Sequence, residues 1–249
     1  MMNEETRRKL REMGMEPFVD ALDQQDDHPD TYAVMTFDER LSMAVDECYT
    51  IRNADRAKRL IRYAKLRYPE ADINTMYYKD RGFDRNQILE LGSCQYIRTQ
   101  TNIFLNGFTG SGKTHLACAL GKEACRHLYR TKYIRMPEML EMLNLAEQTG
   151  TSISTAVKRL SNYQLLIIDE WLMEVPSERE VSYIIEIFEK RHDKWPTILC
   201  SQYKTSEWRA RLGGGTIAEG IVDRVIHNKV EIEMGDINMR AKLAPQYQL

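Results

Sequence analysis

The sequence predicts an α/β fold, with a parallel sheet flanked by helices, preceded by a small all-α domain. After residue 100, short apolar runs alternate with amphipathic stretches of helical length, which is typical of a parallel sheet covered on both faces. Before that point, charged helical patterns dominate. The 249 residues suffice for one large α/β domain with a small appendage. We therefore expect a helical N-terminal domain over residues 1–95 and an α/β domain over residues 96–249.

The N-terminal region carries clear helix signals. Thr36 and Glu39 have the spacing of a capping box, which predicts the start of a helix. Apolar residues then recur at helical spacing, and Pro69 ends the pattern. A second, shorter helix is expected over residues 84–91, with Gly92 as its C-cap residue.

The elements of the α/β region follow in alternation. The apolar run at residues 165–168 is unbroken, and this predicts a strand in the buried centre of the sheet. The predicted strands cover residues 102–105, 132–135, 165–168, 197–200 and 230–234. The predicted helices cover residues 113–129, 137–147, 177–194 and 216–226.

Composition excludes several classes of protein. The net charge of −2 does not indicate nucleic-acid binding, so only a local charge cluster can do so. No run of 18 apolar residues exists and the N-terminus lacks an apolar core, so we expect neither a membrane partner nor a secretory signal. The five cysteines include no C-x-x-C pair, which argues against zinc and disulfides. We expect a cytoplasmic protein with free thiols.

A phosphate-binding motif stands between the first predicted strand and the next helix. The pattern G-x-x-x-x-G-K-[ST] is met in full by Gly107, Phe108, Thr109, Gly110, Ser111, Gly112, Lys113 and Thr114. Glycines let the backbone N–H groups point at phosphate oxygens, the lysine brings a positive charge, and the threonine hydroxyl can bind Mg²⁺. We expect this loop and His115 after it to bind a nucleoside triphosphate. The alternative is a glycine turn before a helix, but the strand-to-helix context favours a phosphate site.

Two acids end the most apolar strand. Asp169 and Glu170 follow the run at residues 165–168, about 55 residues after the motif. A strand-end Asp holds Mg²⁺ in ATPases that carry this loop, and an adjacent Glu can polarise the attacking water. We expect Thr114 and Asp169 to bind the metal and Glu170 to be catalytic together with Lys113. Alone, such an ending is equally consistent with a solvated loop.

Other polar residues are weaker candidates. Ser201 and Gln202 end the next apolar run and could contact the γ-phosphate, or they could form a plain turn. Arg224 and Arg240 lie in predicted helical segments, where lone arginines are usually solvated.

A dense basic stripe lies in the N-terminal region. Between residues 52 and 67, one acid, Asp55, accompanies seven cations. The candidate DNA contacts among them are Arg52, Arg56, Lys58, Arg59, Arg62 and Lys65. Contacts with phosphates would give salt-dependent, sequence-independent binding. The alternative is a solvated helix face paired with the acidic segment at residues 20–30.

The motifs together resemble the IstB family of ATP-binding transposition helpers, within the AAA+ clade that also holds the DnaC helicase loader. The resemblance rests on residues 110–117, the strand and acids at 165–170, Ser201-Gln202 followed by Trp208, and residues 221–228. It implies a P-loop AAA+ ATPase whose subunits assemble side by side. Phe108-Thr109 and Trp171 depart from the usual family residues, which suggests a divergent member with altered partner specificity.

The resemblance also implies roles for the weaker candidates. Arg224 matches the position of an arginine finger offered to a neighbouring subunit, and Arg240 matches a sensor of the γ-phosphate. Ser201 or Gln202 would contact the reacting groups, and the basic stripe would contact duplex DNA. ATP and Mg²⁺ are the implied cofactors.

The implied function is assembly on duplex DNA, deformation of that target, and recruitment of a partner transposase under the control of ATP hydrolysis. The alternative is a loader of the DnaC type that binds single-stranded DNA and a replicative helicase. A small-molecule kinase is disfavoured, because no lid-like arginine cluster is evident and the Asp169-Glu170 pair favours activation of water.

Overall fold

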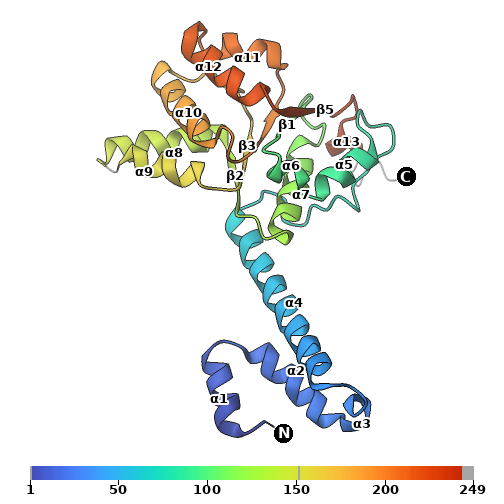
Figure 1. Ribbon diagram of the computed structural model, residues 1–249. Helices are drawn as coiled ribbons and strands as arrows, with labels where there is room; N and C mark the ends of the chain where they lie inside the picture. Colours follow the sequence, from blue (N-terminus) through green and yellow to red (C-terminus); the bar gives the residue numbers. More distant parts are fainter. Residues whose placement is uncertain (1, 151, 243–249) are drawn as a thin grey trace. The chain divides into compact units, whose positions relative to one another are not determined.

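The structure, a computed structural model, describes residues 2–150 and 152–242. The chain divides into two compact units, Met1–Arg59 and Leu60–Leu249 (Figure 1). No helix in these described ranges is long and apolar enough to cross a membrane.

The first unit is helical. It contains α1 (Glu4–Glu12), α2 (Glu16–Asp27), α3 (Pro29–Tyr32) and most of α4 (Phe37–Ala64). The predicted capping box before α4 is confirmed: Glu39 N–H donates to Thr36 Oγ1 at 3.3 Å, and Thr36 N–H donates to Glu39 Oε2 at 2.7 Å. These bonds satisfy two N–H groups at the start of the helix that have no partner within it.

The helices of the first unit pack through small buried side chains and a hydrogen bond. Ala44 and Cys48 of α4 are buried, as is Val19 of α2. The Gln25 amide of α2 donates to the Arg40 carbonyl at 2.9 Å. With few large side chains buried, this unit has a small core compared with the sheet of the second unit.

The second unit is built on the predicted parallel sheet. Its strands are β1 (Asn102–Asn106), β2 (Thr131–Arg135), β3 (Leu165–Asp169), β4 (Thr197–Ser201) and β5 (Lys229–Glu233). The strand order is β2-β3-β4-β1-β5, and every pairing is parallel. In this register Arg135 pairs with Asp169 and Asn106 with Ser201, so the carboxyl ends of the strands meet at one edge. That edge is where ligands bind in open parallel sheets.

Helices cover both faces of the sheet (Figure 1). Alternate residues of β1 show this, because Ile103 and Leu105 belong to one apolar cluster and Phe104 to the other. The first cluster includes residues of α5 (Arg85–Gly92), α6 (Gln95–Arg98) and α7 (Lys113–Arg126). The second includes residues of α8 (Met136–Gln148), α9 (Ile153–Ser161), α10 (Glu178–Arg191), α11 (Thr205–Arg211) and α12 (Gly215–Ile226). The last described element is α13 (Met239–Lys242).

The division between the units lies between Arg59 and Leu60, whereas the sequence predicted it after residue 95. Residues 60–95 pack with the sheet unit because their apolar side chains are buried against the apolar face of α7. Leu66, Ile73 and Ile88 are buried in the same cluster as the apolar face of α7. The segment therefore forms part of the wall around the site described next.

Candidate active site

The phosphate-loop segment joins the end of β1 to the start of α7. Gly110 and Gly112 adopt φ values of +90° and +93°, a region that favours glycine. Lys113 Nζ donates to the carbonyls of Gly107 at 2.6 Å and Phe108 at 3.0 Å. Burial lowers the pKa of Lys113, and a phosphate beside the amine would favour its charged form. The N-terminal end of α7 opens toward the same space, as anion binding requires.

The Thr114 hydroxyl and the Asp169 carboxylate lie together at the edge of the sheet. Thr114 Oγ1 donates to Asp169 Oδ2 at 2.7 Å, and the Tyr133 hydroxyl donates to the same oxygen at 2.8 Å. Asp169 is only 2% exposed. A hydroxyl and a carboxylate are the oxygen ligands that Mg²⁺ prefers, so the donor set fits the expected metal.

Glu170 follows directly after the last residue of β3. Its φ of +57° is unusual for a residue with a side chain, and its N–H donates to Asp169 Oδ1 at 2.9 Å. The Glu170 carboxylate accepts a hydrogen bond from Arg135 at 2.6 Å, and Arg67 lies 3.8 Å from its other oxygen. The bond to Glu170 raises the pKa of Arg135. The expected catalytic carboxylate is therefore held by two cations.

A cavity of about 520 Å³ opens over the loop and the acids. Ten of the residues expected from the sequence line it: Thr109, Gly110, Gly112, Lys113, Thr114, His115, Asp169, Glu170, Gln202 and Arg240. Burial lowers the pKa of His115, so its ring brings little positive charge at neutral pH. Sequence reasoning missed the opposite wall, which includes Arg67, Tyr68, Tyr77, Arg81 and Met239.

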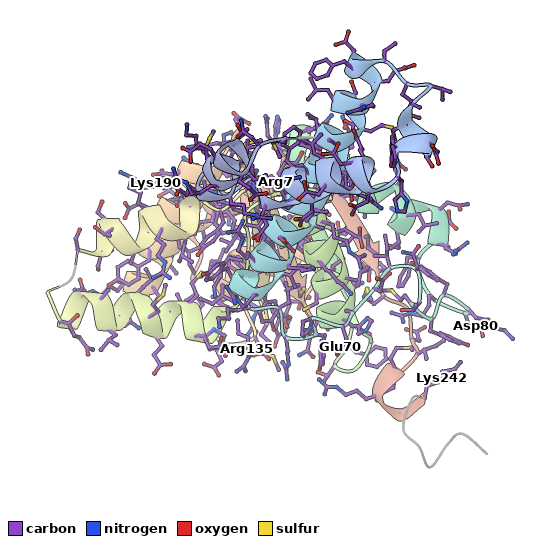
Figure 2. All side chains as sticks on the ribbon, turned by 90° about the horizontal axis from the view of Figure 1, so that it is seen from below. Arg7, Glu70, Asp80, Arg135, Lys190 and Lys242 are labelled. Carbon is purple, nitrogen blue, oxygen red and sulfur yellow. The ribbon has the colours of Figure 1, made fainter. Side chains whose placement is uncertain are left out.

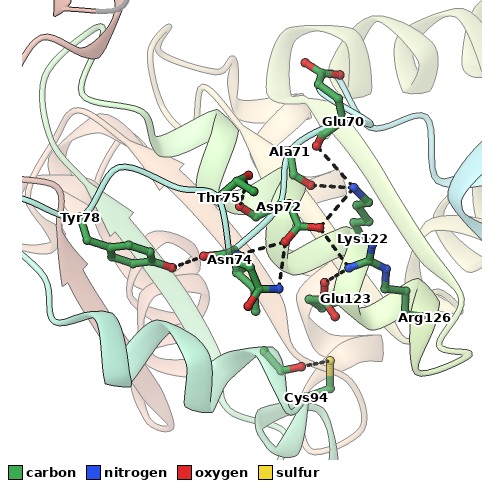
Figure 3. Close-up of polar contacts among 12 residues, drawn as sticks. Glu70, Ala71, Asp72, Asn74, Thr75, Tyr78, Cys94, Lys122, Glu123 and Arg126 are labelled. Atoms are coloured by element: carbon green, nitrogen blue, oxygen red, sulfur yellow. Dashed lines mark hydrogen bonds and ion pairs between the residues drawn. The ribbon is translucent and has the colours of Figure 1, made fainter.

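That wall is anchored to α7 through Asp72 (Figure 3). Asp72 accepts hydrogen bonds from Asn74 N–H at 3.0 Å and from Arg126 of α7 at 3.2 Å. Lys122 of α7 donates to the Ala71 carbonyl at 3.2 Å and lies 3.6 Å from Asp72. The paired charges fix the segment against the helix that carries the phosphate loop.

The other end of the wall meets α13. Lys242 Nζ donates to the Tyr77 hydroxyl at 2.6 Å, and Figure 2 shows Lys242 and Asp80 at this edge of the second unit. Met239 N–H donates to the Gly110 carbonyl at 2.9 Å, which ties α13 to the phosphate loop. Arg240 is thereby brought to the cavity, as its expected role requires.

Five expected site residues are not among the residues that line the cavity: Gly107, Phe108 and Ser111 of the loop, and Ser201 and Arg224. Ser201 is buried, and its hydroxyl donates to the Trp171 carbonyl at 3.0 Å. Arg224 lies on α12, where it donates to the Gly220 carbonyl at 2.8 Å and pairs with Glu189 at 3.2 Å. Of Ser201 and Gln202, only Gln202 lines the cavity. Arg224 does not line the cavity of its own chain.

The six candidate DNA contacts lie along α4 and at Lys65 just after it, and all are exposed. Lys58 pairs with Asp55 at 3.1 Å, while the other five form no ion pair within the described ranges. In the acidic segment at residues 20–30, Asp23 instead pairs with Arg7 of α1 at 2.6 Å. Most of the positive charge of the stripe is therefore not paired with an acid of the described ranges.

Comparison with known proteins adds the family. The family described as IstB-like ATP binding protein matches residues 8–246. A Sinorhizobium fredii protein named as an insertion sequence ATP-binding protein is 32% identical over 98% of both chains. The ATP-binding protein of insertion sequence IS1162 from Pseudomonas fluorescens is 34% identical over 83% of this chain and 89% of its own.

Solved structures agree on the fold. DnaA from Aquifex aeolicus bound to AMPPCP superposes with a TM-score of 0.56 and 24% identity over 72% of this chain, and the match spans about half of the DnaA chain (54%). The DnaC helicase loader gives 0.56 and 19% identity over 67% of this chain and 98% of its own. These likenesses confirm the P-loop AAA+ fold. The family match and the two sequence relatives show that the chain belongs to the family of IstB-like ATP-binding proteins, which are ATPases of the AAA+ type.

Proposed function

We propose that this ATPase is a transposition helper that assembles on duplex DNA, deforms its target and recruits a partner transposase, with ATP hydrolysis controlling the assembly. The observation that carries the proposal is the exposed basic stripe along α4 and at Lys65, most of whose charges form no ion pair within residues 2–150 and 152–242. Two sequence relatives are named as ATP-binding proteins of insertion sequences, which supports the proposal.

The stripe suits the backbone of DNA. Arg52, Arg56, Arg59 and Tyr63 recur every three or four residues along α4, so they share one face of the helix. The Arg62 guanidinium lies 5.2 Å from the centre of the Tyr63 ring. Arginines spaced along a helix neutralise phosphates without reading bases, which suits a factor that accepts many target sequences.

The hydrolytic step is assigned to the site at the sheet edge. Lys113 would hold the β- and γ-phosphates, and Glu170, once free of Arg135, would orient the water that attacks the γ-phosphorus as the bond to the β-phosphate breaks. Thr114 and Asp169 would hold Mg²⁺, which neutralises charge on the phosphates when bound. Gln202 and Arg240, at the rim of the cavity, would contact the γ-phosphate.

The proposal includes assembly of several copies of the chain. Arg224 lies away from the cavity of its own chain, on α12, so we assign it to the site of a neighbouring copy. A guanidinium delivered by a second subunit stabilises charge on the transferring phosphoryl group. Hydrolysis would therefore require a homo-oligomer, and loss of the γ-phosphate would loosen it.

A loader of the DnaC type is the second candidate, favoured by the fold likeness to the DnaC helicase loader. The two functions differ in the nucleic acid that drives assembly. Duplex DNA would promote oligomers of a transposition helper, whereas single-stranded DNA and a helicase would promote those of a loader.

The test is sedimentation and ATP hydrolysis of the purified protein with duplex or single-stranded DNA, beside a Glu170→Gln variant. Large assemblies that need both ATP and duplex DNA, and that persist in the variant, support the helper. Assembly only on single strands would replace it with the loader. A triple variant, Arg52→Gln, Arg56→Gln and Arg59→Gln, should lose duplex binding. A control with the same charge change at Lys79, Arg98 and Lys194, which are exposed and lie elsewhere, should keep it.

A further inference from the structure

Arg81 lies against the phosphate loop although no motif contains it. Its Nη2 donates to the Ser111 carbonyl at 2.7 Å. A Cβ built on Gly112 would come within 3.2 Å of Nη2 and 3.7 Å of Nη1, so the guanidinium packs on this glycine. Arg81 also lines the cavity over the loop, together with His115 of α7.

The backbone around Arg81 fixes the direction of its side chain. A Cβ on Gly82 would lie 2.6 Å from the Glu233 carbonyl oxygen and 2.7 Å from Gly235 N, so this close approach of two chain segments requires glycine. The Arg81 guanidinium carbon lies 4.7 Å from the centre of the Phe83 ring, a cation–π contact. A flexible surface arginine would have neither constraint.

The charge of Arg81 has no counterpart among the residues that the structure describes. Across the residues that the structure describes, no carboxylate forms an ion pair with Arg81, and its buried Nε has no hydrogen-bond partner. Burial lowers the pKa of this guanidinium. A partly desolvated cation with an unused donor is costly unless an anion completes its environment.

The position of Arg81 beside the phosphate loop indicates which anion would complete its environment. The loop around Gly112 and the first turn of α7 is where backbone N–H groups meet phosphate oxygens. The Lys113 amine donates to the carbonyls of Gly107 and Phe108, whereas Arg81 donates to the carbonyl of Ser111. We propose that Arg81 binds, within its own chain, a phosphate that ATP and ADP share.

This role differs from those expected of Arg224 and Arg240. Those residues would respond to the γ-phosphate, so their contribution would end with hydrolysis. Arg81 would bind the nucleotide both before and after hydrolysis, and would thereby slow the release of ADP. The inference rests on nucleotide binding in the cavity and does not depend on which DNA or protein partner the ATPase serves.

The test is the dissociation constant of the full-length protein for ATP, ADP and adenosine, measured by calorimetry for wild type, Arg81→Gln and Arg81→Lys. Loss of one charge-assisted contact should weaken ATP and ADP by the same factor, about tenfold to a hundredfold, and leave adenosine unchanged. The lysine variant should recover part of the loss. Arg85→Gln, which removes an exposed arginine outside the cavity lining, is the matched control and should bind as wild type.

Two results would overturn the inference. Unchanged ADP affinity in Arg81→Gln would show that no shared phosphate is bound. An equal loss for adenosine, together with a lower melting temperature of the nucleotide-free protein, would show that Arg81 only supports the loop. If Arg81→Gln does not fold, Arg81→Lys still decides, because it keeps the charge but loses the planar fork that makes bidentate contacts, so binding of both nucleotides should weaken severalfold.

Discussion

Arg135 donates a hydrogen bond to Glu170 across 2.6 Å, from the end of β2 to the residue just after β3. The two strands are neighbours, and Arg135 pairs in register with Asp169. Glu138 lies 3.3 Å from the same guanidinium, and Arg67 lies 3.8 Å from Glu170. A carboxylate bonded to two cations is less available to orient an attacking water. In the proposed catalytic role of Glu170, these bonds would therefore restrain hydrolysis.

The first prediction concerns this restraint. Arg135→Gln should raise the basal rate of ATP hydrolysis severalfold, because Glu170 loses its strongest partner and becomes available to water. Phosphate release at saturating ATP measures the change in kcat. Arg135→Lys, which keeps a charge at the position, is the control and should stay close to wild type. A fall to the level of Glu170→Gln would instead make Arg135 a positive contributor to hydrolysis.

The second prediction concerns magnesium. Asp169→Asn should abolish the increase in ATP affinity that Mg²⁺ produces and should lower hydrolysis by about a hundredfold or more, since the metal neutralises charge on the phosphates. ATP binding titrated with and without EDTA measures this. Tyr133→Phe, which removes a hydroxyl that bonds to Asp169 but keeps the carboxylate, is the control and should retain Mg²⁺ dependence. An Asp169→Asn protein that still responds to Mg²⁺ would show that other groups hold the metal.

The third prediction concerns Arg191, a buried cation of α10 at 2% exposure. It donates to the Tyr163 carbonyl at 2.7 Å and to Thr197 Oγ1 at 2.9 Å, and it also binds the Pro196 carbonyl. These bonds join α10 to the segments that lead into β3 and β4. Arg191→Met would leave the buried acceptors unpaired, so we expect a loss of about 3 kcal/mol in the free energy of unfolding.

Urea unfolding followed by circular dichroism measures that loss. Lys190→Met changes the adjacent, exposed cation and is the matched control, expected within about 0.5 kcal/mol of wild type. If both variants lost equally little, the bonds of Arg191 would not contribute net stability.

The sequence was sufficient for the sheet and for the phosphate loop, because both depend on local patterns. The unbroken apolar run at residues 165–168 became the fully buried β3, an interior strand that lies between β2 and β4. The glycines before Lys113 bend the chain as their motif demands. The match of the family over residues 8–246 confirms the resemblance drawn from these segments.

The rest of the site depends on contacts between distant segments, which no local pattern reports. Arg81 lies 30 residues before Ser111, and Arg135 lies 35 residues before Glu170. The division near residue 95 was predicted from a change in composition, but residues 60–95 pack on α7 through buried side chains such as Leu66. A signal was present in the apolar residues between 64 and 91, which need a larger core than a small helical domain supplies.

The last prediction concerns alkaline pH. All five cysteines are buried, and burial raises the pKa of the Cys118 and Cys125 thiols to about 11. In the unfolded chain such thiols titrate near pH 8.5, at about the ordinary value. The folded state therefore holds these protons more tightly. This difference contributes to the free energy of unfolding in full at pH values below the thiol pKa of the unfolded chain. The contribution is lost as the pH rises to about 11.

Each thiol should contribute a decrease of about 1.4 kcal/mol per pH unit across that window. Urea unfolding at pH 8 and pH 10.5 measures the total for wild type and for a Cys118→Ala, Cys125→Ala variant. The variant should be less stable than wild type at pH 8, because methyl-sized cavities replace the sulfurs, but the difference should shrink or reverse at pH 10.5. Lysine and tyrosine titrations are common to both proteins and cancel in the comparison. Equal losses of stability in the two proteins would mean that the thiols do not titrate differently on unfolding.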